Sequence, residues 1–460
     1  MARTQDAALA TVASPDATAT AASAPSLVDT ASAARLRRFR LQIFISTWSS
    51  YFGFYFCRKA FFVVKGDLTA QLGLDAPTLA RIGFVYLVAY AIGEFNAAAL
   101  GSRLGARRLL LAGMAVSVGC NIAFGFANNA WTFMAFMALN GLAQATGWSG
   151  NVGTMAHWFR REERGRVMGV WSTCYQVGGA MANGFAAFML GLLGWRWSFF
   201  GASLVLGAIW FLFHALQKNR PEDVGLPAVV DEPRAPEAND STAAASAPHA
   251  GFDRRLVVTI LMMGGFYFFV KFIRYALWSW SPYFLQLNYG LANDQAGYFS
   301  TLFDIFGFFG VLAAGFVSDR YFRGHRAGIA LIMMVGLTLA AAMMWAFGTQ
   351  GVIAFGVTYS IAGFMLYGPD SLISGAGAID VGSRKHAIVA AGVINGMGSV
   401  GAVVQELVVG QLYHRGAGHA GPSDPSQLVP ILIALLASAA VATVVLSFLA
   451  LRARRGLCNL

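Results

Sequence analysis

Charged residues are scarce in this sequence. They make up 12% of its 460 residues, whereas hydrophobic residues make up 57%. A typical soluble domain is about 25% charged and about 45–50% apolar. The composition therefore argues against a soluble enzyme, a disordered chain and a nucleic-acid-binding protein.

Motifs that would hold a metal, a cofactor or a covalent intermediate are also missing. The four cysteines show no metal-ligand spacing, which argues against a zinc site and a disulfide framework: Cys57, Cys120, Cys174 and Cys458. Residues 396–401 match the dinucleotide fingerprint G-x-G-x-x-G, but they lie in an apolar stretch and follow no strand. We interpret them as a site of close helix packing. We expect no cofactor, no metal and no enzymatic activity.

Long apolar stretches are abundant instead. A bilayer core about 30 Å thick is crossed by a helix of about 20 apolar residues. Twelve stretches meet this length: 41–64, 80–100, 108–127, 131–158, 166–192, 197–216, 256–285, 296–317, 327–346, 351–376, 387–413 and 428–451. The sequence therefore predicts an all-α membrane protein with twelve transmembrane helices.

The polar segments divide the chain into two helical units. The first residues are rich in Ala, Ser and Thr without an apolar core, which is typical of a disordered tail and not of a signal peptide. A polar, proline-rich stretch in the middle is typical of a linker. The predicted parts are a disordered cytoplasmic N-terminal tail, a six-helix bundle, a cytoplasmic linker, a second six-helix bundle and a cytoplasmic C-terminal tail: 1–40, 41–216, 217–254, 255–451 and 452–460.

The surplus of positive charge sorts by side of the membrane. If the N-terminus is cytoplasmic, 25 of the 33 Lys and Arg residues lie on the cytoplasmic side. Four lie on the opposite side: Lys65, Arg81, Arg196 and Arg415. The positive-inside rule therefore predicts that both termini are cytoplasmic, and it accounts for most of the net charge of +11.

The two predicted bundles repeat each other. Gly53-Phe54-Tyr55-Phe56 in the first span recurs as Gly265-Phe266-Tyr267-Phe268 in the seventh, 212 residues later, and Arg58 and Arg274 are 216 residues apart. A duplicated six-helix unit is typical of secondary transporters. We therefore expect two pseudo-symmetric six-helix bundles with a substrate site between them.

Three cations inside predicted spans are candidates for an anion site. Arg58 lies late in the first span, and Lys271 and Arg274 share one face of the seventh. A guanidinium matches phosphate with two hydrogen bonds and stays charged at physiological pH. Alternatively, each arginine pairs with a carboxylate in the membrane or reaches an interface. For Lys59, on another face, we expect an interface anchor.

The carboxylates inside the spans are few enough to name, because a charge there is costly unless it faces a cavity or a partner: Glu94, Asp304, Asp370 and Glu406. Tyr86 and Tyr90 share a helix face with Glu94. These carboxylates could bond the substrate, hold an arginine when the site is empty, carry a proton or take part in gating. Structural ion pairs and helix packing are the alternatives.

Several local motifs resemble a known family. Residues 101–108 and 315–320 resemble the two loop motifs of the major facilitator superfamily, with Ser102 where an Asp is usual in the first. Residues 55–59, and Arg274-Tyr275 followed by Trp280-Ser281-Pro282, resemble the arginine motifs of its organophosphate:phosphate antiporters. That family includes glycerol-3-phosphate and hexose-phosphate transporters, a hexose-phosphate sensor and sugar-phosphate exchangers. The resemblance covers nearly all of residues 41–451.

The resemblance implies a fold, a function and a site. It implies the major facilitator fold, in which the two arginines clamp the substrate phosphate; here these would be Arg58 and Arg274. The full predicted substrate site is Arg58, Arg274, Lys271, Tyr86, Tyr90, Glu94, Tyr175 and Asp304. Glycerol-3-phosphate transporters align a lysine with Glu94 and a histidine with Tyr175. The first difference suggests a substrate that carries a cationic group, such as an amino-phosphate or a phosphonate.

We therefore expect a monomer in the bacterial cytoplasmic membrane that exchanges an organic phosphate for inorganic phosphate by alternating access, with no nucleic-acid partner. Two alternatives stay open. A proton-coupled organic-anion transporter would depend on Glu94 or Asp304, and a sugar-phosphate sensor would bind its ligand without useful flux. For Asp370 and Glu406 a proton or gating role stays open beside the alternative that each faces a neighbouring helix.

Overall fold

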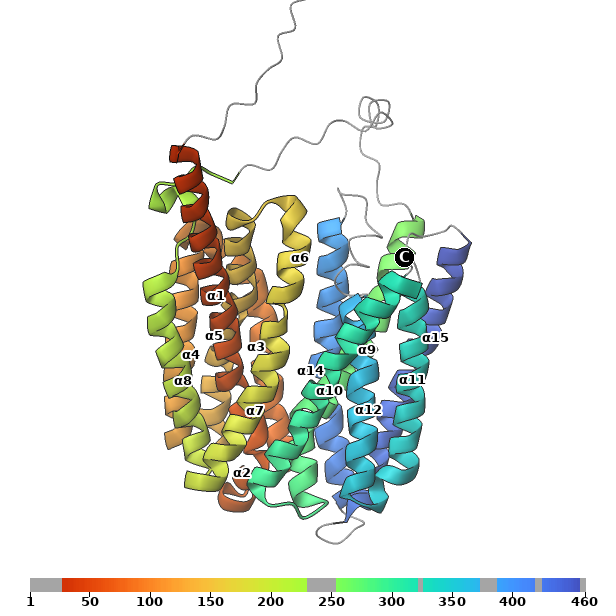
Figure 1. Ribbon diagram of the computed structural model, residues 1–460. Coiled ribbons are helices and arrows are strands. Elements are labelled where there is room, and N and C mark those ends of the chain that lie inside the picture. Colours follow the sequence, from red (N-terminus) through yellow and green to blue (C-terminus); the bar gives the residue numbers. More distant parts are fainter. Residues whose placement is uncertain (1–26, 230–253, 322–325, 373–386, 418–423, 456–460) are drawn as a thin grey trace, which may run out of the picture.

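The computed structural model describes residues 27–229, 254–321, 326–372, 387–417 and 424–455, which are almost entirely helical (Figure 1). Twelve long helices occur in this part of the chain: α1 (Leu27–Val63), α3 (Ala76–Leu104), α4 (Ala106–Phe126), α5 (Ala130–Trp158), α7 (Thr173–Leu193), α8 (Trp195–Leu216), α9 (Arg254–Leu287), α10 (Asn293–Tyr321), α11 (Arg326–Phe347), α12 (Val352–Ser371), α14 (Ala387–Ala417) and α15 (Val429–Arg454). The predicted all-α membrane fold is confirmed.

Short helices join some of the long ones. They are α2 (Lys65–Leu72), α6 (Arg161–Trp171) and the 3-10 turns η1 (Pro221–Val224), η2 (Gly348–Gln350) and η4 (Pro425–Leu428). Helices α6 and α7 together occupy the fifth predicted span, with the break at Ser172, whose hydroxyl donates to the carbonyl of Gly169. Helix α12 ends at Ser371, and the end of its predicted span lies outside the described residues.

Ten of the described helices are long and apolar enough to cross a membrane by themselves. Helices α1 and α5 complete the predicted twelve, and polar side chains of the two helices contact each other. Ser50 of α1 donates to Asn151 of α5 at 2.9 Å, and both side chains are buried. Their polar residues therefore bond within the protein, where lipid does not reach them.

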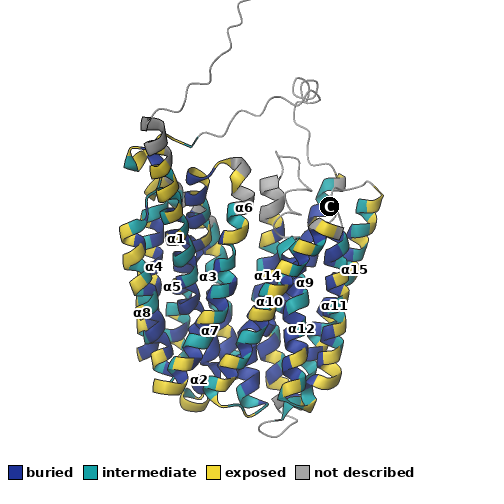
Figure 2. Cartoon of the chain, viewed as in Figure 1, coloured by how far each residue is buried: buried dark blue, intermediate teal, exposed yellow. Residues whose placement is uncertain are grey.

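The helices form two bundles side by side, one made by α1–α8 and the other by α9–α15 (Figure 1). In the first bundle α3 packs on α5 and α1 packs on α7 and α8; in the second, α14 packs on α9 and α10 packs on α12. The bundles meet through α7 with α10 and through α3 with α14. Large apolar side chains are exposed on the outward faces, as expected for contact with lipid (Figure 2).

The two ends of the molecule differ. The start of α1 and the end of α15 lie at one end, which we call the terminal end, and α2 lies at the other, which we call the α2 end (Figure 1). The bundles lie closest together toward the α2 end in this view. The start and end of the described chain thus share one end of the bundle.

Helix α1 begins earlier than predicted. Residues 27–40 were expected in a disordered tail, but they continue the helix to Leu27. This stretch is rich in Ala, Leu and Arg, which favour helix. It is also held by contacts, because Arg35 donates to the carbonyl of Val224 and Arg40 to that of Trp158, both at 2.8 Å. Residues 1–26, and residues 230–253 of the predicted linker, lie outside the described residues.

Two of the three glycines of the G-x-G-x-x-G match serve helix packing, as interpreted. A Cβ added to Gly398 would lie 2.4 Å from the ring of Tyr267, and one on Gly401 would lie 2.2 Å from the carbonyl oxygen of Phe268. Helix α14 can therefore approach α9 this closely only with glycine at these two positions. At Gly396, by contrast, a Cβ would meet open space.

Candidate functional site

The described structure contains several cavities. One of them, with a volume of about 580 Å³, lies between the two bundles. Residues of α1, α3, α5 and α7 line it from the first bundle, and residues of α9, α12 and α14 line it from the second. We call it the central cavity. Its charged lining residues are Arg58, Glu94, Lys271, Arg274 and Asp370. This size and this mixture of apolar walls and polar groups suit a small ligand.

Arg58 is held in the central cavity by an amide and by aromatic rings. Its side chain is buried, and its Nε donates to Oε1 of Gln144 at 2.8 Å. The guanidinium carbon lies 4.8 Å from the ring centre of Tyr55 and 5.0 Å from that of Tyr90. Its Nη2 is buried without a hydrogen-bond partner, and no described carboxylate lies within ion-pair distance. Arg58 thus keeps donor capacity for a ligand.

A polar network fixes Gln144. Its Nε2 donates to the hydroxyl of Ser117 at 3.2 Å, and that hydroxyl donates to Oδ1 of Asn140 at 2.6 Å. Asn140 in turn donates to the carbonyl of Cys57, the residue before Arg58. The network therefore connects three helices and leaves the amide oxygen of Gln144 free to accept from Arg58.

Arg274 has a different environment, because it is paired with a carboxylate of its own bundle. Its Nη1 donates to Oδ2 of Asp370 at 2.8 Å. The guanidinium carbon lies 4.6 Å from the ring centre of Tyr367 and 5.9 Å from that of Tyr175. Arg274 therefore pairs with a carboxylate inside the membrane, which was the alternative to an anion site. Its side chain keeps 16% of its surface accessible, so a ligand in the cavity can still reach it.

The remaining predicted cation and carboxylate also face the central cavity. The Nζ of Lys271 donates to Oδ1 of Asn395 at 3.3 Å and lies 5.2 Å from the ring centre of Tyr267. Glu94, at the end of its membrane span, lines the same cavity and is partly exposed. The cavity thus combines three cations with two carboxylates.

Two residues of the predicted site do not line this cavity. Tyr86 is buried behind it and donates to Oε1 of Gln144 at 3.1 Å, so it supports the group that holds Arg58. Asp304 is 3% exposed and pairs at 3.3 Å with Lys59, and it accepts a 2.6 Å hydrogen bond from Tyr367. Of the predicted substrate residues, the structure gathers Arg58, Lys271, Arg274, Tyr90, Glu94 and Tyr175 around one space.

Lys59 does not lie at an interface, contrary to expectation. It is 1% exposed, and its Nζ lies 3.7 Å from the ring centre of Trp278 and 3.3 Å from Oδ2 of Asp304. Helix α1 turns this residue toward the second bundle, where a carboxylate and an aromatic face compensate its charge. The pair links α1 to α10 across the boundary between the bundles.

Lys65 was predicted to lie on the side of the membrane opposite the cytoplasm, without a partner. Lys65 is fully buried at the start of α2, and its Nζ lies 3.3 Å from Oε2 of Glu406 in α14. Glu406 also accepts hydrogen bonds from Ser279 at 2.7 Å and from Trp280 at 2.9 Å. This second pair again joins the two bundles. The sequence did contain a signal for this pair, because Lys65 in the first repeat and Glu406 in the second have opposite charges.

Uncharged lining residues were also missed. Among the tyrosines, Tyr51, Tyr55, Tyr267 and Tyr275 line the central cavity beside the predicted Tyr90 and Tyr175. Gln144 gives the direct contact to Arg58. Asn140 and Gln144 are four residues apart on an apolar helix, and this spacing of two amides could have indicated an inward polar face.

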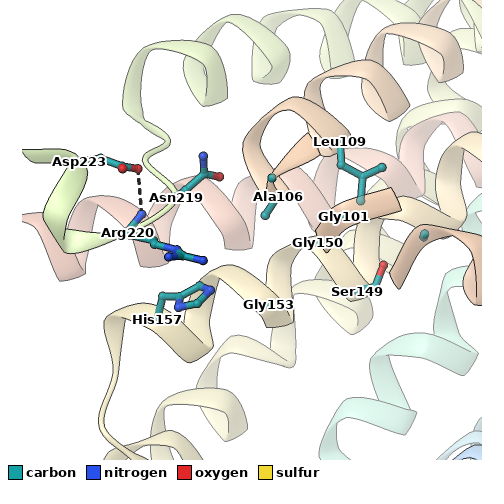
Figure 3. Close-up of a pocket in the computed structure, with 12 residues that line it drawn as sticks. Gly101, Ala106, Leu109, Ser149, Gly150, Gly153, His157, Asn219, Arg220 and Asp223 are labelled. Atoms are coloured by element: carbon teal, nitrogen blue, oxygen red, sulfur yellow. Dashed lines mark hydrogen bonds between the residues drawn. The ribbon is translucent and has the colours of Figure 1, made fainter. Parts of the chain in front are cut away.

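Another cavity, of about 720 Å³, lies within the first bundle (Figure 3). It is lined by the ends of α3 and α5, the start of α4 and the segment around η1, and it includes His157 in the last turn of α5. Asn219 and Arg220 enter from the start of the linker, and Asn219 accepts from the backbone N–H of Arg107 at 2.8 Å. No described residue of the second bundle lines it, so it is a poor candidate for a site shared by both repeats.

Comparison with known sequences identifies relatives over most of the chain. The model of the Major Facilitator Superfamily matches residues 44–405. A probable hexose phosphate transport protein of Chlamydia trachomatis is 27% identical over 88% of this chain and 90% of that protein. A putative glycerol-3-phosphate transporter 3 of Arabidopsis thaliana is 30% identical over 82% of each. The membrane sensor protein UhpC of Escherichia coli is 27% identical over 80% of this chain and 85% of that protein.

Comparison with solved structures supports the fold. A bacterial homologue of the human lysosomal transporter Spinster, in an inward-facing and unoccupied conformation, matches with a TM-score of 0.68 at 15% identity. The match covers 89% of this chain and 95% of that one. At this level of identity the likeness concerns the fold alone. Because the family model, the sequence relatives and the twelve-helix architecture agree, the chain belongs to the Major Facilitator Superfamily, a family of transport proteins and not of enzymes.

Proposed function

We propose that this protein transports an organic phosphate and exchanges it for inorganic phosphate. The observation that carries the proposal is the state of Arg58: a buried guanidinium in a cavity between the bundles, with Nη2 unbonded and no described carboxylate in ion-pair range. A buried cation of this kind is stabilised by an anion. The names of the relatives, which include hexose phosphate and glycerol-3-phosphate transporters, support phosphate as that anion.

The two arginines would hold the phosphate from opposite bundles. Arg58 offers free donor capacity from α1, and Arg274 faces the same space from α9. A phosphate oxygen that bonds Arg274 competes with Asp370 for Nη1. Lys271 adds positive charge on the same face of α9. Binding would thus connect the two bundles through the ligand.

Transport by alternating access requires the α2 end to open when the terminal end closes. The pair Lys65–Glu406 joins the bundles at the start of α2, and Lys59–Asp304 joins them next to the central cavity, so both must separate or rearrange when the bundles rock. We assign Asp304 and Glu406 to this gating. We assign Asp370 the role of pairing with Arg274 when the cavity holds no ligand. We take residues 41–216 and 255–451 as the two units that move.

Exchange follows from the same charges. If the cavity closes without a ligand, Arg274 keeps Asp370 as a partner, but Arg58 has only the neutral amide of Gln144. Closing over an uncompensated cation is unfavourable, so the return step needs an anion. Inorganic phosphate fits this requirement because it offers the same oxygens to the same two arginines.

We further propose that the terminal end faces the cytoplasm of a bacterial cell and that the protein lies in the cytoplasmic membrane. The support is the excess of Lys and Arg in the segments predicted for that side. One chain supplies both walls of the central cavity, so a monomer is sufficient for transport.

A reconstituted exchange assay tests the proposal. Liposomes with the purified protein are loaded with phosphate, or with sulfate as a control, and labelled glucose 6-phosphate and glycerol 3-phosphate are offered outside. We expect uptake that requires internal phosphate and is unaffected when the pH gradient is removed. Uptake into phosphate-free vesicles driven by a pH gradient would instead show a proton-coupled transporter. Saturable binding without uptake would show a sensor, the role that the name of one relative states for that protein.

A further inference from the structure

A second, apolar space adjoins the central cavity. It has a volume of about 640 Å³ and lies between α3 and α5 of the first bundle and α14 of the second. Its apolar walls include Ala91, Ile92, Ala145, Val400 and Val403. We call it the lateral groove.

The lateral groove and the central cavity share three lining residues. Glu94, Trp148 and Asn395 line both spaces, so these three side chains form the junction. Asn395 also accepts a hydrogen bond from Lys271 at this point. A ligand whose phosphate lies at the cations of the central cavity can therefore extend past Trp148 and Asn395 into the groove.

The groove arises because α3 and α14 diverge. Near the α2 end they touch: a Cβ on Gly410 would lie 2.4 Å from the Cβ of Ala80, and one on Gly83 would lie 2.9 Å from the carboxyl carbon of Glu406. From Ala80 to Ile92 the helix advances by about 18 Å at 1.5 Å per residue. At that level Ile92 is 53% exposed, so the two helices no longer cover each other.

Gly396 keeps the groove open. It lines the groove on α14, and no heavy atom lies within 4 Å of the position of an added Cβ. The neighbouring glycines Gly398 and Gly401 are required by contact with α9, but Gly396 is not. The missing side chain therefore leaves space next to the junction and removes no contact between helices.

We propose that the lateral groove holds an apolar chain of the transported phosphate, so that the substrates include phosphate monoesters with a short alkyl chain. The inference rests on the proposed function, because the phosphate of such a ligand occupies the cations of the central cavity. The polar junction faces the ester oxygen and the first carbons, and the apolar walls face the rest of the chain. A bilayer lipid in the groove is the competing occupant, and it would make no use of the junction.

The test compares alkyl phosphates of increasing length as inhibitors of phosphate exchange in proteoliposomes, from methyl to hexyl phosphate. Burial of one methylene contributes about 0.8 kcal/mol, or about fourfold in affinity. With partial burial we expect the inhibition constant to fall by about tenfold or more between methyl and hexyl phosphate. The same inhibition constants for both compounds would overturn the proposal.

Two glycine variants locate the effect. Gly396→Phe places a ring in the lateral groove, whereas Gly119→Phe places one on an exposed face of α4 where a Cβ also meets open space. The readout is the ratio of the inhibition constants of methyl and hexyl phosphate within each variant. We expect Gly396→Phe to lower this ratio to near one and Gly119→Phe to retain it. An unchanged ratio in Gly396→Phe would show that the chain binds elsewhere or simply enters the bilayer.

A binding measurement separates this proposal from the proposed function. Titration calorimetry of methyl and hexyl phosphate on the purified protein does not require transport. If phosphate exchange is absent but hexyl phosphate binds about tenfold more tightly, with loss of the difference in Gly396→Phe, then exchange fails and the groove assignment stands. If exchange occurs but chain length has no effect on binding, only the groove assignment fails.

Discussion

The buried lysines and the arginines of the central cavity differ in their partners. The lysines pair with the opposite bundle, and the arginines do not. Between the central cavity and the α2 end, Lys59 and Lys65 of the first bundle each contact a carboxylate of the second bundle at 3.3 Å. In the central cavity, Arg274 contacts a carboxylate of its own bundle, and Arg58 contacts only the amide of Gln144. The protein therefore neutralises the two lysines across the bundle boundary by itself, whereas in the proposed mechanism a ligand joins the bundles in the cavity.

This difference separates two steps of transport, which are the closing of one end of the molecule and the binding of the substrate. Paired charges at the α2 end allow that end to close without a ligand, because each buried cation has its partner. In the proposed mechanism, the anion binds first to Arg58, where a donor is free, and then competes with Asp370 for Arg274. Variants that remove the partner of one cation at a time test this difference.

The largest effect is expected when a partner at the α2 end is removed. Glu406→Gln leaves Lys65 buried without a negative charge, which typically costs about 3–5 kcal/mol. We expect a clear drop in Tm in detergent. The double variant Lys65→Met, Glu406→Gln removes both charges and should recover most of the loss. A Glu406→Gln protein as stable as wild type would mean that the pair does not hold this end.

A smaller effect is expected in the cavity, and with the opposite sign. Asp370→Asn weakens the hold on Arg274, so that phosphate no longer competes with a carboxylate. We expect phosphate to bind about tenfold more tightly, or about 1.4 kcal/mol, as measured by calorimetry. Asp304→Asn is the matched control, because Asp304 does not line the cavity and should not tighten binding. Weaker binding in Asp370→Asn would contradict the competition.

Gln144→Ala should have a modest effect on the other arginine. The variant removes the acceptor of Arg58 Nε and of Tyr86, so the guanidinium loses its fixed orientation. A lost hydrogen bond of this kind is worth about 1 kcal/mol, which corresponds to about fivefold weaker phosphate binding. Calorimetry of phosphate binding measures it. An effect as large as that of replacing Arg58 itself would mean that Gln144 contacts the ligand directly.

The smallest effect concerns a carboxyl at the α2 end that lacks a cation. Asp67 lies in α2 and accepts hydrogen bonds from Asn293 and Gln71. Burial raises the pKa of Asp67 from 3.8 to about 6. The ionised form therefore destabilises the closed α2 end above about pH 6, and this cost is lost as the pH falls through and below that pKa.

Replacing Asp67 tests this pH dependence. We expect Asp67→Asn to raise Tm at pH 7.5 by about 2 °C and to have no comparable effect at pH 4, where the wild-type carboxyl is largely protonated. Asp75→Asn is a useful contrast, because hydrogen bonds from Thr78 lower the pKa of Asp75, which caps α3. Its loss should lower Tm at pH 7.5. A lower Tm in Asp67→Asn at pH 7.5 would contradict the sign.

Much of the fold could be predicted because the bilayer imposes length and apolarity on each helix. The same constraint made Arg58, Lys271 and Arg274 stand out, and all three line one cavity. The start of α1 was missed because helix beyond the membrane has no apolar signal, and it depends on contacts such as that of Arg35 with Val224.

Pairing across the bundles could not be predicted from the sequence. Lys59 follows Arg58 directly, but a helix turns successive residues by about 100°, so one faces the cavity and the other faces Asp304. Which carboxylate each cation meets depends on how the bundles are placed, and no local pattern carries that information. Gln144 was missed because an amide in an apolar helix gives a weaker signal than a charge.

The central claim is that Arg58 and Arg274 hold one phosphate together. Calorimetric titration with inorganic phosphate of the wild type, Arg58→Lys, Arg274→Lys and the double variant tests it as a thermodynamic cycle. Lysine keeps the charge but loses the two-pronged geometry, so we expect each single variant to bind about 30- to 100-fold more weakly, or about 2–3 kcal/mol. The double variant should be only slightly worse than either. Wild-type affinity in one single variant, or losses that add fully in the double variant, would contradict a shared clamp.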